Sequence, residues 1–185
     1  MRQLFFFDRP NRFVAGTVGT PGERTFYLQA VDGPRIVSVA LEKQQVAVLA
    51  DRLEELLDDI VARTGTAFAA AAADNDALEQ PVDEEFRVAA MGLKWDGDTG
   101  LVMIEAQAPV ETIAEAEQTL LEDVDEGPDA LRVLIEPPVA RSFVERARKL
   151  VSAGRPPCPL CSQPLDPDGH VCVRLNGYHR GIALQ

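Results

Sequence analysis

Two stretches of the chain, residues 41–57 and 135–151, align with each other without a gap, and this alignment restricts the fold more than any other feature. In both stretches a strand-like run ends at a glutamate. Apolar residues then recur every three or four positions, as on the buried face of an amphipathic helix. The pattern predicts an internal duplication. The aligned pairs are Glu42 with Glu136, Leu49 with Phe143, Asp51 with Glu145, Arg52 with Arg146, Leu56 with Leu150 and Leu57 with Val151.

Runs typical of β-strands precede each of the two helices. They are rich in β-branched and aromatic residues and are separated by turns that contain Gly, Pro or Asp. We therefore predict an α+β fold with two pseudo-repeated units, each a β-hairpin, a strand and a helix. These units form antiparallel sheets backed by helices, rather than a doubly wound parallel sheet. The predicted strands are residues 12–18, 24–31 and 34–41 in the first half, and 86–95, 100–108 and 131–137 in the second.

These patterns divide the chain into four parts. Residues 1–64 form the first repeat and residues 86–154 the second. Residues 65–85 are rich in alanine and then acidic, without a useful amphipathic period, which predicts a flexible linker or a frayed helix. Residues 155–185 form a separate tail that contains every cysteine and histidine of the chain.

The net charge of −12 is unevenly distributed along the chain. Residues 137–185 carry seven basic and three acidic side chains, whereas residues 1–136 carry 11 basic and 27 acidic ones. An acidic body repels phosphates, so nucleic-acid binding by the whole chain is not expected. The basic tail could contact an acidic partner, or it could dock on its own body. The sequence shows neither a signal peptide nor a membrane span, which predicts a cytoplasmic protein with reduced thiols and no membrane contact.

The tail contains a cysteine–histidine motif, CPLCSQPLDPDGHVC, at residues 158–172. Two ligand pairs, Cys158 with Cys161 and His170 with Cys172, are separated by a loop rich in Pro, Asp and Gly. A hairpin would bring them together as three thiolates and one imidazole, a donor set typical of tetrahedral Zn²⁺. We predict one structural zinc ion in a zinc-ribbon-like tail. A Cys158–Cys161 disulfide, chance clustering, and His179 as the fourth ligand remain alternatives.

No catalytic site is predicted. Four protein ligands leave no open coordination position for water, and the tail is too short to fold around an apolar core of its own. Motifs for phosphate loops, dinucleotide binding, nucleophile elbows and zinc proteases do not occur in the chain. If His170 were not a ligand, the metal would have an open position and catalysis would again be an alternative.

The stretch RLNGYHR, residues 174–180, follows the motif directly and combines positive charge, hydrogen-bond donors and one aromatic ring. Such a set suits a phosphate, a nucleotide or an acidic peptide. The simpler alternative is a turn at Asn-Gly whose arginines pair with the acidic body. The candidate partner-binding residues are Arg174, Asn176, Tyr178, His179 and Arg180.

The tail RPPCPLCSQPLDPDGHVCVRLNGYHR and the opening FDRPNRFVAGTVGTPGERTFYLQ resemble an actinobacterial family defined only as a domain of unknown function. The resemblance extends over the whole chain. It implies a cytoplasmic protein of about this size but no particular activity.

The leading functional hypothesis is a non-catalytic binding or adaptor protein whose metal-stabilised basic tail contacts a protein or a phosphate-bearing partner. Two alternatives are kept. One is an enzyme in which zinc, His179 and the tail arginines act on a phosphoester or nucleotide. The other is nucleic-acid binding through the tail alone.

Overall fold

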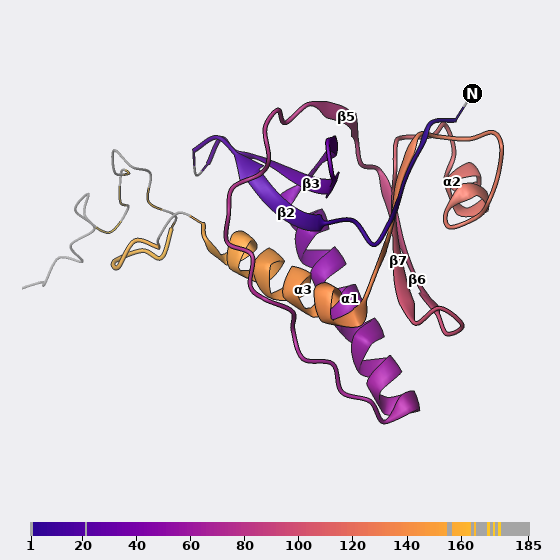
Figure 1. Ribbon diagram of the computed structural model, residues 1–185. Coiled ribbons are helices and arrows are strands. Elements are labelled where there is room, and N and C mark those ends of the chain that lie inside the picture. The colour runs from indigo at the N-terminus through magenta and orange to yellow at the C-terminus, as the bar shows by residue number, and fades with distance from the viewer. Residues whose placement is uncertain are drawn as a thin grey trace, which may run out of the picture.

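A computed structural model describes residues 2–20, 22–154, 157–163, 165, 170, 172 and 174. In these residues the chain forms two four-stranded sheets and three helices (Figure 1). In chain order the elements are β1 (Leu4–Asp8), β2 (Arg12–Val18), β3 (Thr25–Asp32), β4 (Arg35–Leu41), α1 (Lys43–Thr64), β5 (Glu84–Arg87), β6 (Ala90–Asp96), β7 (Leu101–Gln107), α2 (Ile113–Thr119), β8 (Ala130–Ile135) and α3 (Pro137–Ser152).

Each sheet consists of an antiparallel meander and one added parallel strand. Strands β2, β3 and β4 form one meander and β6, β7 and β8 the other. Strand β5, from the second half, pairs in parallel with β4, and β1, from the first half, pairs in parallel with β8. The two halves therefore exchange edge strands, giving the orders β2-β3-β4-β5 and β1-β8-β7-β6. The predicted α+β fold, with sheets backed by helices, is confirmed.

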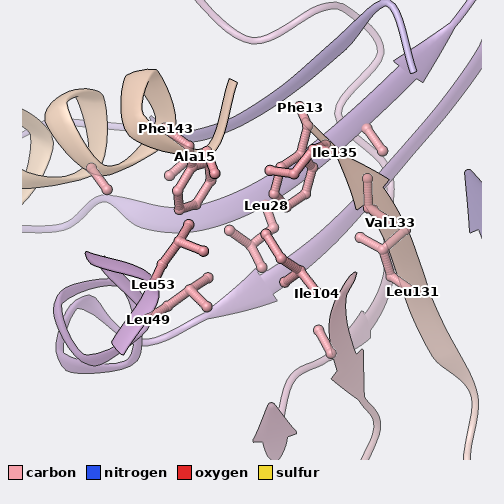
Figure 2. Packing of buried hydrophobic residues seen from close by; sticks show 14 of the residues in the cluster. Phe13, Ala15, Leu28, Leu49, Leu53, Ile104, Leu131, Val133, Ile135 and Phe143 are labelled. Atoms are coloured by element: carbon pink, nitrogen blue, oxygen red, sulfur yellow. The ribbon is translucent and has the colours of Figure 1, made fainter. Parts of the chain in front are cut away.

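The inner faces of both sheets and one side of α1 and α3 enclose a single apolar core (Figure 2). Phe13 of β2 stacks on Phe143 of α3, with ring centroids 5.0 Å apart. Leu53 of α1 is fully buried, and burying a leucine contributes about 1.5–3 kcal/mol to stability. Both halves of the sequence thus depend on the same core. The other core residues labelled in Figure 2 are Ala15, Leu28, Leu49, Ile104, Leu131, Val133 and Ile135.

The long helices begin and end with local signals that the sequence contains. Glu42 and Gln45 form a capping box at the start of α1. Gly65 ends α1 in the left-handed conformation, with φ of +71°, and its N–H donates to the carbonyl of Val61. Pro138 lies in the first turn of α3, as predicted. No helix in the described ranges combines the length and the apolar character that crossing a membrane requires.

Residues 65–83, predicted as part of a flexible linker, contain no helix or strand but lie in fixed contact with the body. The side-chain amide of Gln29 exchanges two hydrogen bonds with the backbone of Glu79, at 2.8 and 3.0 Å. Leu78 is buried over Gly16 of β2, where an added Cβ would lie 2.4 Å from the leucine. The segment therefore covers the outer face of this sheet. Composition did not predict this, because the contacts depend on residues about 50 positions away in the sequence.

Candidate metal centre

The four predicted ligands lie together near the end of the described chain. Cys158, Cys161, His170 and Cys172 each offer one donor atom, and these atoms all lie within 4.8 Å of one another. The sulfurs of Cys158 and Cys172 are 3.9 Å apart, and all three cysteines are free thiols rather than a disulfide. Cys158 and Cys172 are almost fully buried. The cluster could hold a metal ion.

The chain turns tightly around the sulfur of Cys158. The N–H of Ser162 donates to the carbonyl of Cys158 at 2.8 Å, and the N–H of Cys158 donates to the carbonyl of Gln163 at 2.7 Å. Ser162 closes this turn in the left-handed region, with φ of +61°. The N–H groups of Cys161 and Leu160 donate to the Cys158 sulfur. They lower the pKa of that thiol because they stabilise the thiolate.

The thiol of Cys161 is affected in the opposite direction. The N–H of Gln163 lowers its pKa, but desolvation and the neighbouring thiols of Cys172 and Cys158 outweigh this effect and raise it. The Nε2 atom of His170 lies 3.1 Å from the Cys161 sulfur. Thiols this close resist losing all their protons unless a cation balances the charge. A metal ion would supply that charge, so the residues fit a metal chemically as well as in spacing.

The predicted partner-binding stretch is only partly described. Arg174 is exposed to solvent. The other four candidates, Asn176, Tyr178, His179 and Arg180, lie outside the described residues. This surface, and the alternative of His179 as a ligand, therefore stay predictions.

Similarity to a known protein family extends beyond the cysteine–histidine cluster to most of the chain. The model of a family described as "Protein of unknown function (DUF3090)" matches residues 5–172. The chain belongs to this family. The DUF3090 match covers both sheets except Leu4, includes the three helices of the described residues and extends to Cys172, so all four cluster residues lie within it. The predicted resemblance to a domain of unknown function is confirmed. Searches of curated proteins and of solved structures found no match.

A second polar cluster of the DUF3090 chain, missed in the sequence, is buried behind β7 and β8. The carboxylate of Glu105 accepts hydrogen bonds from Arg132 Nε at 2.5 Å, Arg2 Nη2 at 3.0 Å and the Gln107 amide at 2.8 Å. The side chains of Glu105, Arg132 and Arg2 are at most 5% exposed. Both oxygens of the Glu105 carboxylate accept hydrogen bonds, and the donors come from β7, from β8 and from the residues before β1. The cluster therefore joins these parts of the fold. The sequence contained one signal of this cluster, namely a single charged residue in each of two otherwise apolar strands, Glu105 in β7 and Arg132 in β8.

A third polar cluster, also missed, fixes the segment that follows α1. The carboxylate of Asp74 accepts from Arg12 Nη2 and from Arg146 Nη1, both at 2.9 Å. Arg146 also donates to the backbone carbonyls of Ala15 and Asp76, at 2.7 Å each. Thus α3, β2 and the segment are joined through one guanidinium. The hydrogen bond from Arg12 is the main cause that lowers the pKa of Asp74.

This depressed pKa predicts a pH-dependent contribution to stability. A carboxyl with a lower pKa in the folded than in the unfolded chain stabilises the fold above its ordinary pKa of 3.8. The stabilisation is lost as the pH falls through the folded value. We expect Asp74→Asn to lower the free energy of unfolding at pH 7 by about 1 kcal/mol, since the pair is partly exposed. The difference from the natural chain should shrink in urea denaturation at pH values below about 4.

The matched control for this measurement is Asp58→Asn. Asp58 also pairs with an arginine, Arg141, but its side chain is 65% exposed. We expect a smaller loss of stability in this variant at pH 7. If the two variants behaved alike, the Asp74 cluster would contribute no more than an ordinary surface ion pair.

Proposed function

We propose that the protein is a cytoplasmic, non-catalytic binding or adaptor module whose basic tail is held in shape by one zinc ion. The observation that carries the proposal is the convergence of four donor atoms, three sulfurs and one imidazole, from a segment of fifteen residues. Reduced thiols are needed for this chemistry, which favours the cytoplasm. The role of the metal would be structural, because the tail supplies too few apolar residues to fold without it.

The geometry supports zinc in particular. A tetrahedral Zn²⁺ with bonds of about 2.3 Å to sulfur places two thiolates about 3.8 Å apart. The sulfurs of Cys158 and Cys172 are 3.9 Å apart. Three thiolates and one imidazole complete a four-ligand shell, and a complete shell has no position for a catalytic water. The donor set therefore favours a structural over an enzymatic role.

The proposed partner is a protein or a phosphate-bearing ligand that contacts the residues directly after the cluster. Arg174 follows the ligand Cys172 by two positions and is exposed. A metal bound at Cys172 would limit the freedom of this arginine and lower the entropy lost when a partner binds. The acidic body disfavours long nucleic acids as partners.

The proposal predicts about one zinc ion per chain in protein purified under reducing conditions without chelators. Metal content is measured by atomic emission after gel filtration. Cys161→Ser should lose most of the zinc, because a hydroxyl replaces one thiolate ligand. Ser162→Ala is the matched control beside it and should keep the metal. A chain that contains no zinc under these conditions would refute the proposal.

Cys161→Ser and Ser162→Ala, together with Arg174→Ala, distinguish the role of the metal from the role of the basic residues in partner binding. A partner that recognises the folded tail should be lost with Cys161→Ser and with Arg174→Ala, but retained with Ser162→Ala. If Arg174→Ala had no effect on any partner lost with Cys161→Ser, the basic stretch would not be the contact surface.

A further inference from the structure

A groove of about 780 Å³ lies between α1 and the edge strand β6. This volume is within the range of about 300–1,000 Å³ that ligand sites occupy. Its walls are mainly apolar: Val48, Leu49 and Leu56 come from α1, and Met91 and Leu93 come from β6. Val48 is 47% exposed. The groove therefore offers apolar surface to solvent beside a strand edge.

The backbone edge of β6 differs from the edges of β1 and β2. On β2, Arg146 donates to the carbonyl of Ala15 at 2.7 Å, and on β1, Arg35 donates to the carbonyl of Phe6 at 2.8 Å. Among the described residues, no side chain forms a hydrogen bond with the backbone of β6. Natural proteins usually cover or block such edges, because the free N–H and C=O groups pair with other strands. In β6, by contrast, the free N–H and C=O groups of the edge lie beside an apolar groove.

The corresponding space on the other side of the core is closed. There, Phe13 of β2 and Phe143 of α3 stack at 5.0 Å, and residues 65–83 lie against α3 in an extended path. The sequence alignment places Leu49 at the position of Phe143, and Leu49 lines the open groove. A leucine at this position fills less space than two stacked rings. Residues 65–83 thus cover α3 and β2, the helix and strand that correspond to α1 and β6 in the other half of the chain.

The arginines at the two aligned positions also differ. Arg146 binds the carbonyl of Ala15 and the segment that covers β2. Arg52, aligned with Arg146, pairs instead with Glu55 at 2.9 Å within α1. The acidic residues Glu42 and Asp59 also line the groove. Glu42 pairs with Arg87 at 3.0 Å and Arg52 with Glu55. Among the described residues, Asp59 is therefore the acidic lining residue outside these ion pairs and gives the groove its negative charge. This charge favours a basic ligand.

We propose that this groove binds an extended peptide segment of a partner protein, which adds as a strand to β6. Its alternate residues are apolar and contact the floor between Val48 and Leu93, and its flanking residues are basic. Added strands obtain affinity from backbone pairing and specificity from every second side chain. The site is separate from the cysteine–histidine cluster, so the proposal does not depend on a metal there.

Trp95 provides a direct readout of binding. It is the only tryptophan of the chain and lies at the end of β6, beside Leu56 and Asp59, which also line the groove. The probe is a synthetic peptide as long as β6, with leucine at alternate positions and lysine at both ends. We expect a saturable change in the fluorescence of the full chain, weaker at high salt. A peptide with glutamate in place of lysine should bind at least tenfold more weakly.

Two valines provide matched variants for the apolar contact. Val48 lines the groove, whereas Val18 lies on β2, and they are 47% and 45% exposed. Val48→Gln should weaken the lysine peptide about fivefold, the effect of losing part of one apolar contact. Val18→Gln should leave affinity unchanged. A peptide N-methylated at alternate residues, which cannot donate along one edge, should not bind if it pairs with β6.

The proposal is wrong if the lysine peptide produces no saturable signal, or if the glutamate peptide binds equally well. It is also wrong if Val48→Gln and Val18→Gln have the same affinity. If Val48→Gln changes only self-association in sedimentation experiments, the occupant is a second copy of the chain and not a partner peptide.

Discussion

Replacing Glu105 with alanine is expected to lower the free energy of unfolding by about 3–5 kcal/mol. Glu105 is fully buried and accepts from Arg132 and Arg2, which are also buried. The alanine variant leaves two guanidinium groups in the protein interior without the buried carboxylate that they share. Arg132 keeps its pairing with Asp123, but that carboxylate is 91% exposed and compensates little. Urea denaturation followed by far-ultraviolet circular dichroism measures the loss.

Two further variants show whether the cost arises from the unpaired charges. Arg52→Ala removes one partner of an exposed ion pair and should cost less than about 1 kcal/mol. The triple variant Glu105→Met/Arg132→Met/Arg2→Met removes all three buried charges and should recover much of the stability lost in Glu105→Ala. A Glu105→Ala variant as stable as Arg52→Ala would contradict the prediction.

This cluster also explains how the segment around α2 is attached. The N–H of Leu121 donates to Glu105 at 3.3 Å, and the carbonyl of Glu122 accepts from Arg132 at 2.8 Å. Gly92 of β6 lies directly under Leu121, and an added Cβ would approach that side chain to 2.9 Å. The segment around α2 thus covers the outer face of this sheet because it is hydrogen-bonded to Glu105 and Arg132 and because Gly92 has no side chain in its way. These hydrogen bonds are the anchors of the segment. We expect α2 to detach when the anchors are removed.

The elements that could be predicted from the sequence are those with a clear local period. The three strands of each meander and the two long helices have strong alternation or an apolar stripe, and each is found near its expected residues. The capping box of α1 and the proline at the start of α3 are local as well. Each of these signals lies within a few residues of the element that it determines.

The elements that were missed depend on partners far away in the chain. Strand β1 pairs with β8, so that Leu4 lies opposite Ala130. Strand β5 pairs with β4 over only a few residues. The connection from β1 to β8 passes through most of the chain, and the crossover from β4 to β5 adds the irregular residues 65–83 to helix α1, so neither pairing is marked by a short local signal. Helix α2 had a usable signal, since Thr112 accepts from the N–H of Glu115 in the expected capping geometry, but its acidic surroundings hid it.

The candidate sites divide in the same way. The cysteine–histidine cluster could be predicted because its four residues are close in the sequence and their chemistry is specific. The groove between α1 and β6 could not, because it is lined by residues such as Leu49 and Met91, which come from the two halves of the chain. Exposed backbone at a strand edge leaves no residue pattern. In the sequence, the acidic residues of the groove cannot be distinguished from those on the solvent-exposed face of any amphipathic helix.

Removing the proposed metal ion is expected to unfold the tail and leave the body intact. Among the described residues, the apolar core extends no further than Val151, and the buried Cys158 and Cys172 belong to the separate cysteine–histidine cluster. Cys158→Ser should therefore lower metal affinity by several orders of magnitude, because binding and folding of such a tail are one process. Chelation of the natural chain should have the same effect. Hydrogen exchange at residues 157–163 should become fast in both cases.

Stability of the body is measured in the same samples through Trp95, which packs against the core. Its urea midpoint should change by less than the equivalent of about 0.5 kcal/mol in Cys158→Ser, as for a surface substitution. Ser162→Ala should alter neither the exchange nor the midpoint. If chelation also lowered the Trp95 midpoint, the tail would be part of the cooperative fold. If exchange at residues 157–163 stayed slow without metal, backbone hydrogen bonds alone would hold the turn around Cys158.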